Sequence, residues 1–240
     1  MAGNLNFNDG VLPPCSMNEP HMPVLLLVDN SGSMAGKAIK NAEMGINRFA
    51  SDICKDPKAA ERVDICVITF NDSTCIVQDW RPITEMRSVE FTAGGGTNMS
   101  GALRMAVDKL KERGHLYSDN GVEVRMPYLI MMTDGMGDNI DAISDEIRQR
   151  TDDKKMLPWF LGVSGYDKET AAKITEGKRV FELVDETGFD FTDFFKVMEV
   201  SIKAVSTSAP GEKPTIKDEE NPLKKESCGV KVANLDDWLS

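Results

Sequence analysis

The chain is short of histidine and of positive charge. Its 240 residues include two His, and 28 Lys and Arg stand against 39 Asp and Glu, which gives a net charge of −11. This excess of acid argues against binding to nucleic acid or to an anionic membrane, because both contacts need a basic surface. The scarcity of His limits every mechanism that uses imidazole as a base or as a metal ligand.

Paired cysteines and long apolar runs are missing as well. The five cysteines form no CxxC pair, so neither a disulfide framework nor a zinc ribbon is indicated, and we expect reduced thiols. Apolar stretches such as 23–28 and 129–132 fall far short of the roughly 20 residues that span a bilayer, and the first residues are too polar for a signal peptide. We therefore expect a soluble protein of the cytoplasm.

Short apolar runs alternate with helical patterns along most of the chain. The runs predict six strands, at 23–28, 63–70, 74–80, 127–133, 158–163 and 179–184. Apolar residues at helical spacing follow most of them, as between Ile39 and Ile53. Because parallel strands need a long crossover, the strand at 74–80, which follows its predecessor after only Asn71, Asp72 and Ser73, is expected to be antiparallel and at the sheet edge.

This alternation predicts a doubly wound α/β fold with a mostly parallel six-stranded sheet and helices on both faces. Right-handed crossovers give the strand order 3-2-1-4-5-6, in which the first and fourth strands are neighbours where the winding reverses. Ligands of such sheets bind at that point, outside the carboxyl ends of the strands. We expect residues 1–22 to be an irregular leader, 23–206 to be the domain and 207–240 to be a largely disordered tail.

Three oxygen-rich segments fall at this predicted edge of the sheet. Asp29, Ser31 and Ser33 follow the first strand, Thr97 precedes a helix, and Asp134 follows the fourth strand. Carboxylate and hydroxyl oxygens without His or Cys suit a hard cation such as Mg²⁺ or Mn²⁺, whereas Ca²⁺ fits less well because the charged ligands are few. The sequence therefore predicts a Mg²⁺-type site.

The order DxSxS, then Thr, then Asp resembles the metal-ion-dependent adhesion site (MIDAS) of von Willebrand factor A domains, and every position of that motif is filled. The resemblance extends over nearly all of the predicted domain. It implies that the Ser31 and Ser33 hydroxyls bind the metal directly, and that Thr97 binds directly or through water. It also implies that Asp29 and Asp134 mainly hold coordinated waters. A cation held in this way keeps its charge and an open position, which an Asp or Glu of a partner protein can fill.

Within this family the chain looks most like the bacterial TerY-like proteins of tellurium-resistance and stress-response gene clusters, on the segments VDNSGSM, AGGGTN and PYLIMMTDG. This narrower resemblance implies a cytoplasmic interaction module that works with partners of the kinase or phosphatase type.

Two other functions stay open, a Mg²⁺-dependent phosphoester hydrolase and a metal-free structural subunit. An enzyme is disfavoured. The segment 32–38 has the order of a phosphate-binding loop, but it has one residue too few between its glycines and ends in Ala38, which lacks the required hydroxyl. His21 precedes the first strand and His115 follows the helix that begins at Thr97, so both are expected away from the predicted metal site.

The predicted tail ends in a short motif of its own. Leu235, Trp238 and Leu239 fall at i, i+3 and i+4 beside Asp236 and Asp237, a spacing suited to docking in the groove of a partner. Packing of this segment on its own domain remains an equal alternative.

Overall fold

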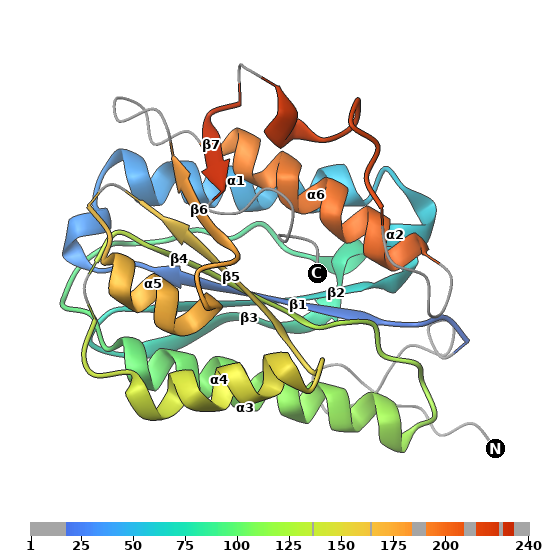
Figure 1. Cartoon of the computed structure of the whole chain (residues 1–240), viewed down its shortest axis with the longest axis horizontal. Helices are drawn as coiled ribbons and strands as arrows, with labels where there is room; N and C mark the ends of the chain where they lie inside the picture. Colours follow the sequence, from blue (N-terminus) through green and yellow to red (C-terminus); the bar gives the residue numbers. More distant parts are fainter. Residues whose placement is uncertain are drawn as a thin grey trace.

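The computed structural model describes residues 18–135, 137–163, 165–183, 191–208, 215–225 and 228–232. Within this part of the chain, seven strands form one sheet in the order β3-β2-β1-β4-β5-β6-β7 (Figure 1). The strands are β1 (Met22–Asp29), β2 (Val63–Phe70), β3 (Thr74–Pro82), β4 (Tyr128–Thr133), β5 (Leu157–Gly162), β6 (Val180–Leu183) and β7 (Val230–Val232). The predicted doubly wound fold and the order of its first six strands are confirmed.

The middle of the sheet is parallel and both of its edges are antiparallel. β1 pairs in parallel with β2 and with β4, and the parallel pairing continues through β5 and β6. β3 runs antiparallel to β2, as its short connection predicts, and β7 runs antiparallel to β6. Every residue of β1 is buried, which is the state expected of an unbroken apolar run at the centre of a parallel sheet.

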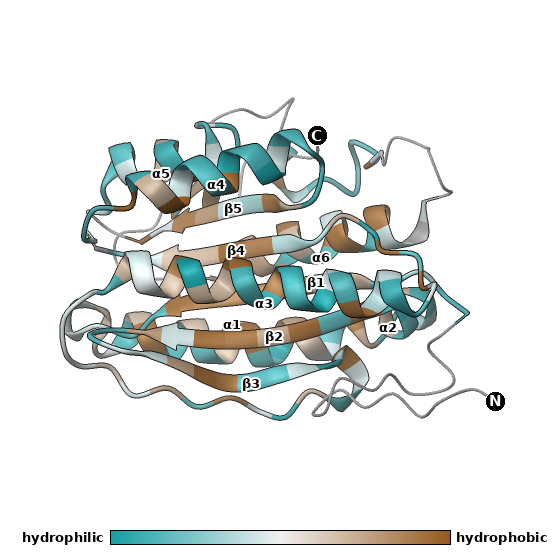
Figure 2. Cartoon of the chain, turned by 90° about the horizontal axis from the view of Figure 1, so that it is seen from below, coloured by the Kyte–Doolittle hydropathy of each residue, from teal (hydrophilic) through white to brown (hydrophobic). Residues whose placement is uncertain are grey.

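Helices cover both faces of the sheet (Figure 2). One face carries α1 (Lys37–Ile53), α2 (Pro57–Arg62) and α6 (Thr192–Thr207), and the other carries α3 (Met99–Asp119), α4 (Asp141–Asp152) and α5 (Lys168–Thr175). Successive residues of β1 alternate between the two cores: Val24 and Leu26 pack toward α1 and α6, while Leu25 and Leu27 pack toward α3. Two hydrophobic cores therefore hold β1 rigidly in place.

The sheet has one strand more than the sequence predicts, because β7 lies in the segment assigned to the tail. Val230 is buried, and the short turn η4 (Pro222–Lys224) before it buries Pro222. The Gly229 N–H donates to Asp193 Oδ2 at 2.7 Å and so ties this segment to the first turn of α6. A strand of three residues in a segment rich in Lys and Glu shows no alternating apolar pattern, so the tail assignment was wrong for 215–225 and 228–232.

Two predicted segments lie mostly or wholly outside the described residues. These are the leader at 1–22 and the docking motif at 233–240. Cys54, Cys66, Cys75 and Cys228 are all free thiols. None of the described helices is both long enough and apolar enough to cross a lipid bilayer.

Candidate metal centre

The predicted site residues meet where β1 and β4 end. These strands are parallel neighbours in register, with Val28 beside Met132. Asp29 is the last residue of β1, and Asp134 follows the last residue of β4. Because parallel neighbours end at the same edge, two segments far apart in the sequence deliver their carboxylates to one place.

Asp29 is fully buried and its carboxylate is held on both sides. Its Oδ1 accepts a hydrogen bond from the backbone N–H of Ser31 at 2.8 Å, and its Oδ2 accepts one from Thr133 Oγ1 at 2.5 Å. The Gly135 N–H donates in turn to Thr133 Oγ1 at 3.1 Å. Asp29 is therefore fixed in position by both strands that form the site.

A chain of oxygens runs from this buried carboxylate to the surface. Ser31 Oγ lies 3.1 Å from Ser33 Oγ, and Ser33 Oγ donates a hydrogen bond to Asp134 Oδ1 at 2.8 Å. Ser31 is buried, Asp134 is partly buried and Ser33 is exposed. The site is thus closed at its floor and open at its mouth.

The loop that carries Thr97 packs against the loop after β1. The Gly32 N–H donates to the Gly95 carbonyl at 3.0 Å, and the Gly94 N–H donates to the Asn30 carbonyl at 2.8 Å. These backbone bonds hold the two loops at a fixed separation. They leave Thr97 in the turn that leads into α3.

The Thr97 hydroxyl and the Asp29 carboxylate both lie next to Gly135. A Cβ at this position would lie 3.7 Å from Asp29 Oδ2 and 3.8 Å from Thr97 Oγ1. The hydroxyl and the carboxylate therefore face the same small space beside Gly135. A larger residue at this position would place its side chain into that space.

Two acids that the sequence reasoning did not select stand near these loops. Asp72 packs against Gly95 and Gly96, where a Cβ would lie 2.3 Å and 2.6 Å from its carboxylate oxygens. Gly95 also has φ of +81°, a conformation that favours glycine. Backbone geometry therefore favours glycine at position 95, and the carboxylate of Asp72 would have to move if either Gly95 or Gly96 carried a side chain.

The second acid, Asp138, joins the start of α3 to the segment after β4. Its Oδ1 accepts from the Ser100 N–H at 2.8 Å, and its Oδ2 accepts from the Ser100 hydroxyl. Burial raises the pKa of Asp138, but the hydrogen bonds from Ser100 outweigh this effect and hold the pKa below its ordinary value. The ionised side chain thus fixes the Thr97 side of the site relative to Asp134.

The electrostatics of the centre favour a cation. Burial raises the pKa of Asp134 and the nearby Asp29 carboxylate raises it further, while the hydrogen bond from Ser33 opposes both effects. No Lys or Arg among the described residues contributes to this balance. Two carboxylates near one another without a described counter-charge would be relieved by a bound cation.

The structure brings together all five predicted residues, namely Asp29, Ser31, Ser33, Thr97 and Asp134. Their individual roles as ligands stay predictions. In the part of the chain that the structure describes, no group of three or more His, Cys, Asp or Glu side chains is placed to hold a metal, so this centre depends on its hydroxyls. Sequence reasoning missed Thr133, although the Thr-Asp-Gly motif contained the signal.

Comparison with known proteins shows which family this part of the chain resembles. Residues 24–136 match the family model of the von Willebrand factor type A domain. The fold agrees with that match: a von Willebrand factor type A structure from Catenulispora acidiphila superposes with a TM-score of 0.56 at 15% identity, over 78% of this chain and 43% of that chain. The match and the fold together make this segment similar to a von Willebrand factor A domain. No curated protein matches the chain.

Proximal thread matrix protein 1 from the mussel byssus has a similar fold. It superposes with a TM-score of 0.54 at 18% identity, over 81% of this chain and 48% of that chain. A structure of the same mussel protein with a zinc-occupied MIDAS motif gives a TM-score of 0.52 at 20% identity, over 78% of this chain and 46% of that chain. The chain spans less than half the length of these solved structures, and at such identities the likeness shows the fold alone.

Proposed function

We propose that the chain is a metal-dependent protein-interaction module that offers a bound Mg²⁺ to an Asp or Glu of a partner protein. The observation that carries this proposal is the convergence of the two carboxylates and three hydroxyls at the carboxyl ends of β1 and β4, where no described Lys or Arg lowers the pKa of Asp134.

The chemistry of the ligands supports a hard divalent cation. All five side chains offer carboxylate or hydroxyl oxygens and none is His or Cys, a set of donors that suits Mg²⁺ or Mn²⁺. Ca²⁺ fits less well because the charged ligands are few. The zinc-occupied MIDAS motif of the mussel protein also supports a divalent metal.

The burial of the ligands supports a role in binding a partner. Asp29 lies at the floor and Ser33 at the exposed mouth, so a cation held between them faces solvent on the Ser33 side. Neutral hydroxyls leave most of the charge of the cation uncompensated, and a carboxylate from outside completes its coordination. A chain with a net charge of −11 would otherwise repel an acidic partner.

We propose the setting from the sequence resemblance described above. The segments shared with TerY-like proteins favour a bacterial, cytoplasmic stress-response complex of the tellurium-resistance type, with a partner of the kinase or phosphatase type. We propose no catalytic role for the site. The residues at the mouth supply no general base other than the ligands themselves, and both histidines belong to the opposite end, since His21 precedes β1 and His115 lies in the second half of α3.

The metal is tested first by thermal unfolding in Mg²⁺, in Mn²⁺ and in EDTA. We expect both metals to raise the melting temperature, because the ligands converge only in the folded state. Ser33→Ala should abolish the rise, and Ser51→Ala, on the exposed side of α1, should keep it. Melting curves that superimpose with and without metal would contradict the proposal and favour the metal-free structural subunit.

The interaction is tested by pull-down from the source cells. One partner should be retained in Mg²⁺, released by EDTA, lost with Asp134→Ala and kept with Ser51→Ala. Retention that is indifferent to EDTA would contradict carboxylate capture by the metal. Hydrolysis of a phosphoester panel by the pure protein in Mg²⁺, lost with Asp134→Ala, would instead support the hydrolase.

A further inference from the structure

A second concave site lies at the edge of the sheet opposite the metal centre. It is a cavity of about 400 Å³ formed by the second half of α3, the segment that leads into β4 and the end of α4. Pro127, the residue before β4, is part of its wall, whereas the metal centre lies beyond the last residue of that strand. The two sites therefore share a strand and occupy its two ends.

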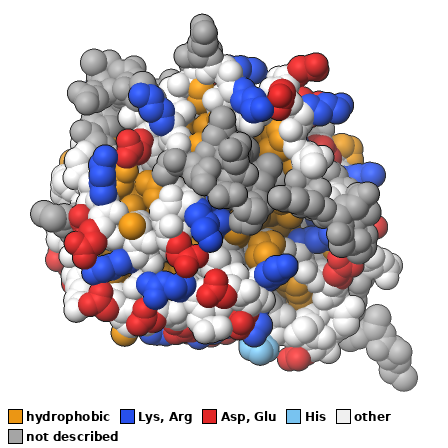
Figure 3. All heavy atoms as spheres, viewed as in Figure 1, with side chains coloured by type: hydrophobic (Ala, Val, Ile, Leu, Met, Phe, Trp, Pro, Cys, Tyr) orange, Lys and Arg blue, Asp and Glu red, His pale blue; other side chains and the backbone are white. Residues whose placement is uncertain are grey.

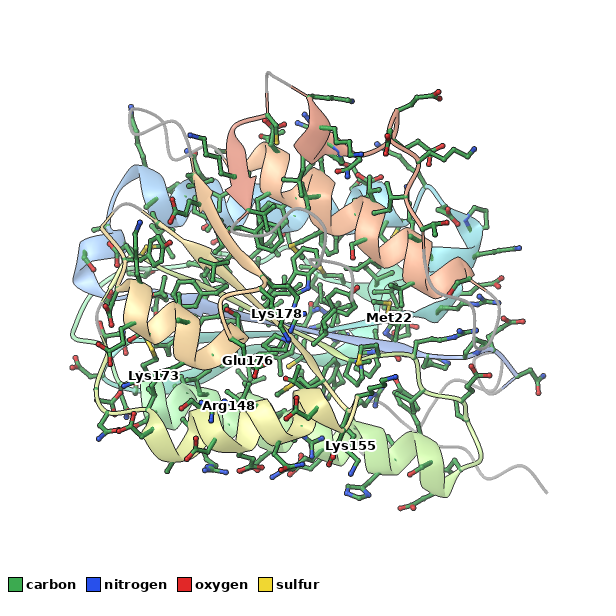
Figure 4. The ribbon with its side chains drawn as sticks, viewed as in Figure 1. Met22, Arg148, Lys155, Lys173, Glu176 and Lys178 are labelled. Carbon is green, nitrogen blue, oxygen red and sulfur yellow. The ribbon has the colours of Figure 1, made fainter. Side chains whose placement is uncertain are left out.

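The lining of this cavity is basic although the chain as a whole is acidic. Its polar walls carry six basic side chains: Lys111, His115, Arg125, Arg150, Lys154 and Lys155. No Asp or Glu belongs to the lining. Figure 4 shows Lys155 where α4 ends beside α3, and Figure 3 shows a histidine next to a basic side chain at the lower edge of the same view. A net charge of −11 for the whole chain does not exclude a local basic surface of this kind.

Acids outside the cavity neutralise three of the five Lys and Arg charges in its lining. Three ion pairs do so, Lys111 with Glu146, Arg125 with Glu123 and Lys155 with Asp153. Arg150 and Lys154 have no ion pair and no side-chain hydrogen bond with any described residue. Two positive charges are thus left without a partner at one cavity.

The guanidinium groups also have unused hydrogen-bond donors. Nε of Arg125 and Nε of Arg150 are buried and have no hydrogen-bond acceptor among the described residues. Glu123 Oε1 lies 3.3 Å from Nε of Arg125 but does not accept a hydrogen bond from it. Since a buried donor without an acceptor destabilises a fold, either group would gain from an oxyanion that reaches it.

We propose that this cavity binds a small-molecule phosphate monoester. Such a group carries a charge of about −2 at neutral pH and offers three acceptor oxygens, which matches the two unpaired cations Arg150 and Lys154. A carboxylate would leave one of the two charges unbalanced. The apolar lining by Leu110, Val124 and Met126 gives the organic part of the ligand a surface to pack on, and the volume of about 400 Å³ is that of a site for a nucleotide-sized molecule.

The backbone at Lys154 offers a variant that removes charge without harming the fold. Lys154 has φ of +56°, the left-handed conformation that commonly ends a helix and that favours glycine. Lys154→Gly therefore removes the ammonium group while relieving backbone strain. A loss of ligand binding in this variant cannot be ascribed to unfolding, and an unchanged or raised melting temperature verifies that point.

The experiment measures binding to the full chain in EDTA at constant ionic strength, so that the metal centre takes no part. The probes are inorganic phosphate, phenyl phosphate, and phenyl sulfate, which has the same shape as phenyl phosphate but one negative charge. We expect saturable binding of both phosphates, with phenyl phosphate the tighter because its ring reaches the apolar lining. Phenyl sulfate should bind about ten-fold more weakly.

Variants then locate the binding. Lys154→Gly and Arg150→Gln should each weaken phenyl phosphate by about ten-fold or more. Arg148→Gln is the matched control, because Arg148 lies on the same helix, pairs with Asp145 and does not line the cavity. Equal weakening in all three variants, equal affinity for sulfate and phosphate, or no saturable binding would overturn the proposal. A phosphoserine peptide that binds more tightly than phenyl phosphate would overturn the assignment to a small molecule.

Discussion

Thr133 Oγ1 donates a hydrogen bond to Asp29 Oδ2 over 2.5 Å, and the two residues end the neighbouring strands β4 and β1. Both side chains are fully buried. The carboxylate at the floor of the metal centre is therefore oriented by the protein itself. A cation that arrives at the mouth meets a partly assembled set of oxygens.

Thr133→Val tests this relationship. The change keeps the branched shape but removes the hydroxyl, so Asp29 Oδ2 loses its donor inside the protein. We expect the free energy of unfolding, measured by urea denaturation in EDTA, to fall by about 1–3 kcal/mol, and Mg²⁺ affinity to fall as well. Thr151→Val is the control, because the Thr151 hydroxyl donates only to the Ile147 carbonyl within α4. Equal effects of the two changes would argue against a special role for Thr133.

The two helical glycines at positions 45 and 114 are expected to respond in opposite directions to alanine. A Cβ on Gly45, in α1, would lie 2.3 Å and 2.5 Å from ring atoms of Phe195 in α6, whereas a Cβ on Gly114, in α3, would meet nothing within 4 Å. Gly114→Ala should therefore stabilise the fold by about 0.5–1 kcal/mol through helix propensity. Gly45→Ala should destabilise it by about 1–3 kcal/mol because the buried ring must move. Urea denaturation of both variants measures the difference, and stabilisation by both would show that α6 adapts freely.

Two buried tyrosines allow a charged and a neutral hydrogen bond to be compared. The Tyr117 hydroxyl donates to the Asp64 carboxylate and accepts from Arg113 Nε at 2.8 Å. The Tyr128 hydroxyl is 2.9 Å from Ser201 Oγ and touches no charge in that contact. We expect Tyr117→Phe to cost about 1.5–3 kcal/mol and Tyr128→Phe about 0.5–1.5 kcal/mol. If urea denaturation gave Tyr128→Phe the larger cost, the buried Asp64 would not depend on Tyr117.

The attachment of β7 through Asp193 should depend on pH. Burial raises the pKa of Asp193, but the Gly229 N–H and the Lys196 ammonium lower it more, so that it lies below the ordinary value of 3.8. The folded state therefore binds the carboxyl proton of Asp193 less tightly than the unfolded state does. The stabilisation that ionised Asp193 provides is complete above pH 3.8, and it is lost as the pH falls through the pKa of Asp193 in the folded protein.

Asp193→Asn should accordingly lower the free energy of unfolding by about 1–2 kcal/mol at pH 7. The difference from the unchanged protein should disappear at the acid end of the range, where both side chains are neutral. Urea denaturation at a series of pH values measures this, with Asp145→Asn, an exposed acid on α4, as the control. A difference that persists undiminished in acid would show that Gly229 does not require the charge.

The centre of the fold and the metal centre could be predicted from the sequence because each rests on a local signal. An unbroken apolar run such as 23–28 admits few placements other than the middle of a parallel sheet, and the residues after it must then lie at its carboxyl end. Asp29 and Asp134 could be placed side by side because right-handed crossovers leave one arrangement for the first and fourth strands.

Features that depend on tertiary contacts were not predicted. The helix α2 begins at Pro57 after Asp56, whose side chain accepts from the Lys58 and Ala59 N–H groups, and its six residues are too few to show an apolar period. β7 owes its conformation to β6 and to Asp193, neither of which is near it in the sequence. The basic cavity could not be predicted from the sequence either, because Arg125, before β4, and Arg150, in α4, line one cavity only after these segments have packed together.

The metal centre joins Ser33 to Asp134, which lie 101 positions apart along the chain. During synthesis Ser31 and Ser33 leave the ribosome early, whereas Asp134 follows only after α1, β2, β3 and α3 have emerged. Until β4 settles beside β1, the early hydroxyls face no second carboxylate. On the proposed function, metal therefore binds only after β4 has formed, and a truncated product that stops before β4 would not bind the cation.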